Sequence, residues 1–212
     1  MTQVSDGRAT RWARHNAARR AELVEAALRA IRRHGHTVAM EDIAATAATS
    51  KTVYYRHFGD RTGLHQAVVT SVHRFIGENL SAPLSSGLAP ADLVPRLTDA
   101  YLRVVEADVE IYRFVTGTPP ASPDPVPGIT HRIGAEVAEA FGRWLRDHGH
   151  DPAPAATWGH GVTGFIWAVA DRWILTDMRR PRSEVVAHVN NLFTPAFTHL
   201  PTPPGAREGA TP

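Results

Sequence analysis

Apolar residues recur at helical spacing along most of the chain, and no segment alternates convincingly at the two-residue period of a strand. The first helical stretch begins near Ala13, and its apolar side follows the spacing i, i+3, i+4, i+7 at Val24, Ala27, Leu28 and Ile31. Gly35 then supplies a C-terminal stop. The pattern predicts an all-α fold that begins with a helix ending near residue 34.

Two short helices and a longer one are predicted next. The third helix covers roughly residues 50–57, and the second repeats the helical spacing at Met40, Ile43, Ala44 and Ala47. Asp60 can cap a fourth helix, whose apolar positions are Leu64, Val68, Val72 and Phe75. Three helices whose second and third members are joined by a tight turn are typical of a helix-turn-helix, which places its last helix in a DNA major groove.

Beyond Pro90 the chain continues as helices separated by proline-rich segments. Helical spacing marks residues 93–104, 110–115, 129–144, 155–178 and 184–197. Residues 116–128 contain five prolines, which predicts a loop. Residues 201–212 are rich in Pro, Gly and Thr, which predicts a disordered tail. About nine helices are therefore expected.

The formal net charge of +2 conceals a basic N-terminal part. Residues 1–64 hold 11 basic and 6 acidic residues, a net charge of +5, whereas residues 65–212 hold 12 and 15, a net charge of −3. A basic region beside a helix-turn-helix favours DNA as the partner. The arginines nearest the start can follow a minor groove or add long-range attraction, and they are Arg8, Arg11, Arg14, Arg19 and Arg20.

Composition also narrows the chemistry. The chain has no cysteine, which excludes disulfides, thiolate zinc sites and cysteine nucleophiles. His34 and His36 flank a glycine at a predicted helix end, as do His148 and His150, and neither pair has a third ligand at a recognised spacing. No phosphate loop, nucleophile elbow or dinucleotide fingerprint is present. We therefore predict no metal site, no cofactor, no catalytic residues and no enzyme activity.

The uncharged segment at residues 152–170 is just long enough to raise the question of a membrane span. Two prolines, three glycines and His160 lie within it, and Asp171 and Arg172 follow at once, so a packed helix is expected instead. The first 20 residues carry five arginines and none of the apolar run of a secretion signal. These features predict a cytoplasmic protein that has no membrane partner.

The third predicted helix carries hydroxyls, cations and phenols, which are groups that can reach base edges and phosphate oxygens. This part of the chain resembles the signature of the TetR family of transcriptional regulators at Gly35, Asp42-Ile43-Ala44, Ser50-Lys51, Tyr55-Arg56-His57-Phe58 and Leu64. The resemblance implies that Tyr55, His57 and Arg61 contact phosphates. It also implies that four residues face bases or the adjoining backbone, namely Ser50, Lys51, Thr52 and Tyr54. Val53 and Phe58 are expected to anchor the helix inward.

Four residues that depart from the family pattern lie on and beside the second helix. Ala48 replaces the usual glycine of the turn, and Ala39 replaces the hydroxyl residue that commonly caps the second helix. Met40 and Glu41 stand where a hydroxyl and a polar base reader are common. Phosphates repel the carboxylate of Glu41, although it can accept a hydrogen bond from cytosine N4. The second helix is therefore expected to contribute less to DNA binding than the third.

The pattern and the resemblance together predict four parts of the chain. These are a flexible basic arm at 1–12, a helix-turn-helix domain at 13–64, a helical ligand-binding and dimerisation domain at 65–200, and the tail at 201–212. The expected function is a repressor that binds a palindromic double-stranded DNA operator as a homodimer. A small-molecule effector would release it by moving the fourth helix, residues 62–80, as a lever.

Dimerisation is expected to use the last two long helices, where small residues beside aromatic ones allow close approach of helices. The predicted interface residues are Trp158, Val162, Val169, Trp173, Val185, Val189, Leu192 and Phe193. The family plan also implies a ligand pocket between the fifth and eighth helices, lined by Tyr101, Tyr112, Phe114, Phe141, Trp144, Phe165, Ile166 and Trp167. This set, aromatic apart from Ile166, favours an apolar or aromatic effector. A loose similarity to TetR-type regulators of lipid metabolism in actinobacteria suggests a fatty acyl group or acyl-CoA.

Two alternatives remain open on the sequence alone. The first is a helical interaction module that has lost DNA binding, an alternative that Ala39, Glu41 and Ala48 support. The second is a cryptic hydrolase. The retained Ser50, Lys51 and Tyr55 argue against the first alternative, and a gel shift with the promoter of the chain's own gene would separate both from a DNA-binding regulator.

Overall fold

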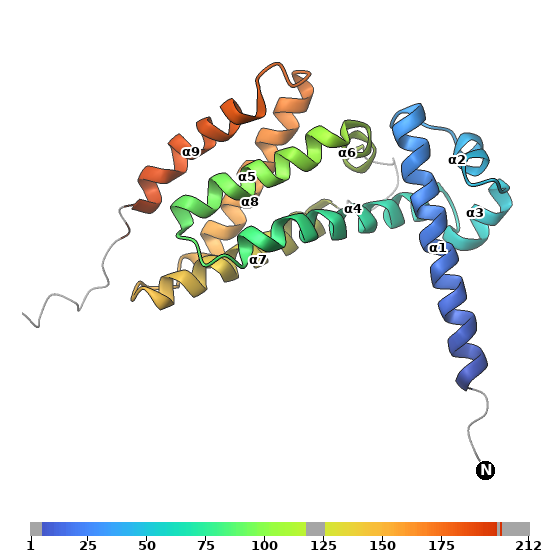
Figure 1. Cartoon of the computed structure of the whole chain (residues 1–212), viewed down its shortest axis with the longest axis horizontal. Coiled ribbons are helices and arrows are strands. Elements are labelled where there is room, and N and C mark those ends of the chain that lie inside the picture. Colours follow the sequence, from blue (N-terminus) through green and yellow to red (C-terminus); the bar gives the residue numbers. More distant parts are fainter. Residues whose placement is uncertain (1–5, 118–125, 199, 201–212) are drawn as a thin grey trace, which may run out of the picture. The chain divides into compact units, whose positions relative to one another are not determined.

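The computed structural model describes residues 6–117, 126–198 and 200, and within these ranges it consists of nine α-helices and no strand (Figure 1). The all-α prediction is confirmed. The helices are α1 (Asp6–His34), α2 (Met40–Thr46), α3 (Lys51–Phe58), α4 (Arg61–Leu84), α5 (Pro90–Ala107), α6 (Val109–Thr116), α7 (Val126–Asp147), α8 (Ala155–Leu175) and α9 (Arg182–Thr198). The predicted tail at 201–212 and the first five residues of the predicted arm lie outside the described residues.

Two compact units can be distinguished by their internal contacts. The first contains α1, α2, α3, α6 and the part of α4 up to His73. The second contains the rest of α4 from Arg74 together with α5, α7, α8 and α9. The chain therefore crosses between the units three times, inside a continuous helix at residues 73–74, at the step from Ala107 to Asp108, and between residues 125 and 126.

The start of α1 differs from the prediction. The helix begins at Asp6, so residues 6–12, which were expected to belong to a flexible arm, are helical. Alanine and arginine, which dominate residues 8–20, are among the best helix formers, and the helix can therefore extend well before its first buried residue, Leu23. Its last turn is basic, which suits the negative end of the helix dipole, and Gly35 follows with φ +86° as the predicted stop.

The core of the first unit is built from the apolar stripe of α1. Ala27 and Ile31 are fully buried, as the helical spacing predicted. The other helices of the unit add Ile43, Leu64 and Val68, which are also buried. This small core fixes α2 and α3 on α1, and it leaves one side of α3 exposed.

The turn between α2 and α3 holds its backbone in an unusual conformation. Ala48 has φ +49°, in the left-handed region, and its N–H donates to the carbonyl oxygen of Ala45 at 3.0 Å. The next N–H, that of Thr49, donates to the carbonyl of Ala44 at 3.0 Å. Left-handed backbone costs an alanine roughly 1–2 kcal/mol, a cost that glycine does not carry.

Replacing Ala48 by glycine is expected to stabilise the protein. Relief of the strain outweighs the larger entropy of glycine in the unfolded chain, which leaves a gain of about 0.5–1 kcal/mol in the free energy of unfolding. Urea denaturation followed by circular dichroism measures it. The control is Ala45→Gly, at an exposed helical position of α2, which should lose about 0.5–1 kcal/mol. Equal losses in both variants would contradict the strain argument.

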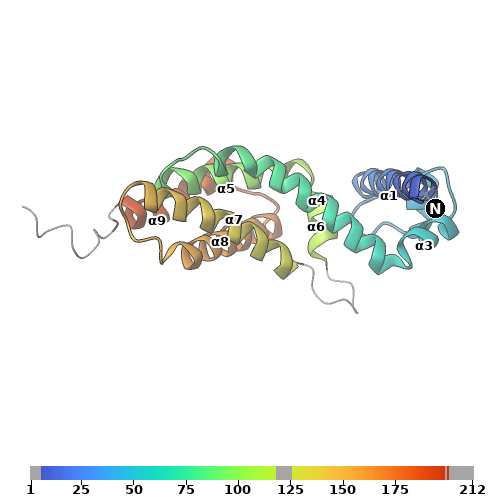
Figure 2. The same ribbon diagram turned by 90° about the horizontal axis from the view of Figure 1, so that it is seen from below.

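In the second unit α7 packs along α8 (Figure 2), and α5 packs along α9. The α7–α8 contact is close because Gly159 of α8 lies against the backbone of Ala138. Arg182 at the start of α9 donates to Asp99 at 2.9 Å and also pairs with Glu106, and both acids belong to α5. Burial opposes ionisation of Asp99, but the hydrogen bonds from Arg182 and Arg103 prevail and lower its pKa. No helix among the described residues is long and apolar enough to cross a membrane.

Candidate DNA-binding interface

The inner side of α3 is fixed to α1 by two aromatic residues. Tyr54 has no exposed surface, its hydroxyl donates to the carbonyl oxygen of Leu23 at 2.9 Å, and its ring stacks on Phe58 with centroids 5.8 Å apart. Burial raises the pKa of Tyr54 to about 12. The prediction that Tyr54 faces DNA is therefore wrong. Phe58 is buried as predicted, whereas Val53 is half-buried.

The outer side of α3 carries the exposed residues of the predicted site. Lys51 and Tyr55 are four residues apart and therefore lie on one side of the helix. Thr52 and Arg56 have the same spacing and lie next to that pair. Ser50 precedes the helix without forming a side-chain cap. The first N–H groups of α3 and its acid-free first turn therefore favour an anion such as a DNA phosphate. Arg56, which was not among the predicted contacts, extends the same surface.

His57 and Arg61, two predicted phosphate contacts, lie where α3 ends and α4 begins. His57 is half-buried, and its pKa is lowered by partial burial and then by the nearby charges of Arg56, Arg19 and Arg20. Arg61 is exposed, and its guanidinium donates to the carbonyl oxygen of Val38 at 3.0 Å. This contact holds the arginine beside the loop that enters α2.

Cations of α1 add to this surface. The guanidinium of Arg20 lies 4.8 Å from the centroid of the Phe58 ring, a cation–π contact that ties α1 to the end of α3. Arg19 pairs with Glu22 at 2.8 Å. Arg14 is exposed, and Arg11 is exposed as well. The side chain of Arg8 lies outside what the structure describes.

One acidic residue interrupts the positive surface. Glu41 of α2 accepts a hydrogen bond from the ammonium of Lys51 at 2.5 Å, and both side chains are exposed. This hydrogen bond lowers the pKa of Glu41 and raises that of Lys51, so both groups stay charged. Ala39 provides no side-chain cap for α2, as its sequence predicted. The α2 end of the surface is therefore an acid–base pair.

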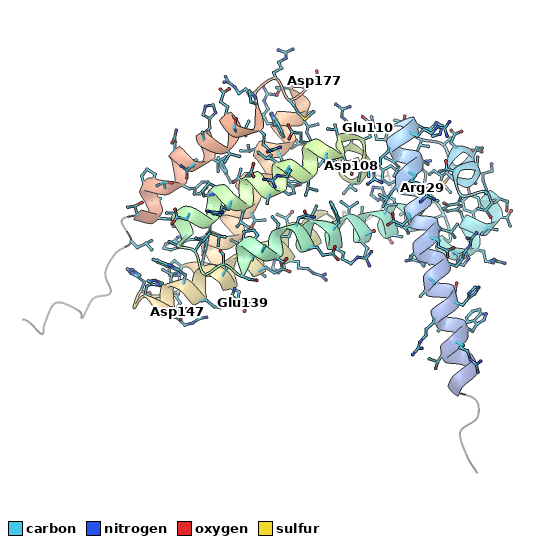
Figure 3. All side chains as sticks on the ribbon, viewed as in Figure 1. Arg29, Asp108, Glu110, Glu139, Asp147 and Asp177 are labelled. Carbon is cyan, nitrogen blue, oxygen red and sulfur yellow. The ribbon has the colours of Figure 1, made fainter. Side chains whose placement is uncertain are left out.

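Helix α6 is fastened to the end of α1 by two acids that the sequence did not reveal, both labelled in Figure 3. Asp108 accepts from Arg32 through both carboxylate oxygens, at 2.7 and 3.0 Å. Glu110 accepts from the backbone N–H of His36 at 2.8 Å and pairs with its ring at 2.8 Å. The hydrogen bond from the His36 side chain is the main cause of the lowered pKa of Glu110.

The other end of α6 is held by His65 of α4. The His65 ring is buried, its Nε2 lies 3.0 Å from the carbonyl oxygen of Phe114, and it packs on the Phe114 ring at 5.1 Å. Burial is the main cause of its lowered pKa, which keeps the imidazole neutral. Phe114 and Tyr112 thus belong to the first unit. Of the eight predicted pocket residues, two therefore lie in the first unit and six in the second, and the pocket between the fifth and eighth helices stays a prediction.

The remaining predicted pocket residues lie in the second unit. Tyr101, Phe141 and Ile166 are buried, and Phe141 packs against Phe197. Trp144 is half-buried and stacks on His148 at the end of α7. Trp167 and Phe165 are half-buried on α8, and Phe165 meets Phe193 edge-on.

A groove of about 850 Å³ runs between α8 and α9 in the same unit. It is lined by apolar side chains and by polar ones, among them Phe165, Val169, Trp173, Arg172, Arg180 and His188. Phe165 is the only predicted pocket residue among its lining residues. This groove could not be predicted from the sequence. Helical spacing shows which side of a helix is apolar, but it does not show how far apart two helices lie.

The predicted interface residues fall into two groups. Four are buried inside the single chain, which differs from the prediction that they face a second copy: Val162, Trp173, Val185 and Val189. The indole N–H of Trp173, for example, donates to the carbonyl oxygen of Arg180 at 2.8 Å. Leu192 is 57% exposed, and the others are half-buried: Trp158, Val169 and Phe193.

The small helical unit with its exposed, basic third helix is typical of a helix-turn-helix regulator. Comparison with known proteins identifies the family. Residues 23–68 match the model for bacterial regulatory proteins of the tetR family, and residues 79–206 match the tetracyclin repressor-like C-terminal domain. An uncharacterised HTH-type transcriptional regulator of Mycobacterium tuberculosis is 31% identical over 210 residues, which cover 98% of this chain and 89% of that protein. The chain belongs to the TetR family of transcriptional regulators, as the sequence predicted.

Solved structures share the fold. A TetR-family regulator from Mesorhizobium loti aligns with a TM-score of 0.63 and 23% identity, covering 86% of this chain and 96% of its own. The transcriptional regulator FadR from Bacillus subtilis, in complex with stearoyl-CoA, aligns with a TM-score of 0.64 and 13% identity, covering 82% and 97%. At these identities the likeness shows the fold alone.

Proposed function

We propose that the chain is a cytoplasmic repressor that binds a palindromic operator as a homodimer and leaves it when a small apolar ligand binds. The observation that carries the DNA-binding part is the exposed side of α3, where Lys51, Thr52, Tyr55 and Arg56 lie beside the acid-free first turn of the helix. The first unit would act as the DNA-binding part, and the second as the ligand-binding and dimerisation part.

Two inverted half-sites are expected because one helix-turn-helix contacts too few base pairs to select a single genomic site. Exposed apolar side chains on α8 and α9 support pairing of the chain with a second copy, since Leu175 is 69% and Leu192 57% exposed. Footprinting on the promoter region of the chain's own gene tests this part. It should reveal two protected half-sites about one helical turn apart, roughly 34–36 Å. Absence of binding would favour the interaction-module alternative.

Tyr55→Ala is expected to weaken operator binding while leaving the fold intact. The phenol is 43% exposed beside Lys51, and loss of a hydrogen bond to a charged phosphate costs about 1.5–3 kcal/mol, or roughly 10- to 150-fold in affinity. Fluorescence anisotropy with an operator duplex measures the change. Thr70→Ala, an exposed position on α4 away from α3, serves as the control. Full affinity in Tyr55→Ala would contradict the assignment of α3 as the DNA-contacting helix.

The ligand is proposed to be fatty acyl in character. The support consists of the aromatic side chains of the second unit and the shared fold of FadR from Bacillus subtilis, whose structure holds stearoyl-CoA. A thermal-shift series with acyl-CoAs of increasing chain length tests the class. Stabilisation that grows with chain length and accompanies release of the operator is the expected result. Stabilisation by aromatic drugs alone would replace the acyl hypothesis.

Release requires a ligand that favours one conformation of the chain over another. Three covalent connections join the two units, namely the continuous helix α4, the step from Ala107 to Asp108 and the step from residue 125 to residue 126. Asp108 precedes α6 without capping it, because its carboxylate is engaged with Arg32 of α1. Movement of α5 would therefore reach α1 through this ion pair, alongside the predicted lever motion of α4.

A further inference from the structure

Glu41 of α2 and Lys51 of α3 form an acid–base pair on the proposed DNA-binding surface. Attraction of positive side chains to phosphates does not explain why a carboxylate lies there. Glu41 and Lys51 come from different helices, and their charged atoms lie 2.5 Å apart. Their side chains keep 63% and 46% of their surface exposed, so both remain accessible to a partner. A carboxylate at this place repels phosphates and so weakens binding to the DNA backbone. It lowers the affinity for DNA unless a base also donates a hydrogen bond to it.

The pair presents a fixed pattern of hydrogen-bonding groups. The carboxylate accepts only, and the ammonium donates up to three hydrogen bonds, one of which is used between them. Each group favours the charged form of the other, so the pattern persists over the physiological pH range. Glu41 also restrains the long side chain of Lys51 at the start of α3, where a free lysine would sample many rotamers.

The edge of a C·G base pair in the major groove has the complementary pattern. Guanine offers the adjacent acceptors N7 and O6, and cytosine offers its N4 amino group as a donor beside them. An ammonium suits the two acceptors, and a neighbouring carboxylate suits the amino group. The edge of an A·T pair instead presents an acceptor at adenine N7, a donor at adenine N6 and an acceptor at thymine O4, followed by the thymine methyl group. With an ammonium and a carboxylate side by side on this edge, the thymine O4 acceptor faces the carboxylate, which cannot donate to it.

We propose that Glu41 and Lys51 act together to read one C·G base pair in each half-site of the operator. This inference rests on the proposed function, because it requires the outer side of α3 to enter the major groove. It makes α2 a contributor to sequence selection, and Glu41 a determinant of specificity at the expense of affinity. Lys51 is then a base contact, and Tyr55, Arg56 and the N-terminal N–H groups of α3 supply the phosphate contacts.

The test compares sequence selection by matched variants. Operators are selected in vitro with the wild type, Glu41→Ala, Lys51→Ala and Asp42→Ala, and affinities for all four bases at each half-site position follow by anisotropy. Asp42 is the control because it is an exposed acid on the same turn of α2. We expect Glu41→Ala and Lys51→Ala to lose discrimination at the same C·G position, by roughly 5- to 150-fold, and Asp42→Ala to keep it.

Glu41→Ala has a second expected signature. Removal of the carboxylate should tighten binding to nonspecific DNA and leave Lys51 free to meet a phosphate, which steepens the salt dependence by about one charge. Unchanged base preferences in Glu41→Ala, or losses at different positions in the two variants, would overturn the inference while leaving DNA binding by α3 in place. Absence of DNA binding by the wild type would overturn the proposed function itself, a separate outcome.

Discussion

Tyr54→Ala is expected to unfold the DNA-binding part of the protein. The substitution removes a fully buried aromatic ring, its stacking on Phe58 and its hydrogen bond to the carbonyl oxygen of Leu23. Truncation of a buried aromatic residue typically costs about 3–5 kcal/mol. Because the first unit has a small core, we expect α2 and α3 to lose their fixed position on α1.

Chemical denaturation and hydrogen exchange measure the effect of Tyr54→Ala. Amides of α2 and α3 should lose protection, and the free energy of unfolding should fall. Tyr55→Ala is a closely matched control, since the same side chain is removed one residue further along at an exposed position, and its effect on stability should stay within about 0.5 kcal/mol. Tyr54→Phe keeps the ring and should cost only about 0.5–1.5 kcal/mol. Equal stability of Tyr54→Ala and Tyr55→Ala would refute the placement of Tyr54.

Gly159→Ala is expected to separate α7 from α8. A Cβ atom at this position would lie 2.4 Å from the backbone nitrogen of Ala138 and 2.6 Å from its Cα, distances that no side-chain rotation relieves. The backbone of one helix would have to move. We therefore expect a loss of about 3 kcal/mol in the free energy of unfolding, at the upper end of the usual cost of overpacking.

Gly161→Ala provides the matched control for this prediction. It adds the same methyl group to the same helix two residues away, where the added carbon contacts none of the described residues beyond the adjoining helix backbone. Here alanine should stabilise the helix by about 0.5–1 kcal/mol, because glycine is a poor helix former. Thermal unfolding of both variants followed by circular dichroism should give opposite shifts in Tm. A stabilised Gly159→Ala would disprove the close approach of the two helices.

The family and the helical architecture could be predicted from the sequence because they depend on local signals. Apolar spacing identified the helices, and Gly35 marked the end of the first one. The phase of α3 was harder to predict. A helix of eight residues with two adjacent tyrosines fits either orientation, and only the Tyr54 hydroxyl bonded to Leu23 decides that Tyr54 lies inside and Tyr55 outside.

Contacts between distant parts of the chain could not be predicted. Arg32 and Asp108 are 76 residues apart, and His36 and Glu110 are 74 apart, so no short pattern marks them as partners. The same limit applies to the division of the chain into units. Phe114 and Phe141 are both apolar residues on helices, and their spacing does not reveal that they belong to different units.

The position of Lys51 at the start of α3 allows selective chemical labelling. Lys51 is the only lysine in this chain, whose other 22 basic residues are arginines. An amine-directed acylating reagent therefore has a single side-chain target, at the first residue of α3. Mass spectrometry of the peptide that contains Lys51 reports its occupancy apart from any α-amine label, and acylation there removes the positive charge of a side chain on the proposed DNA-binding surface.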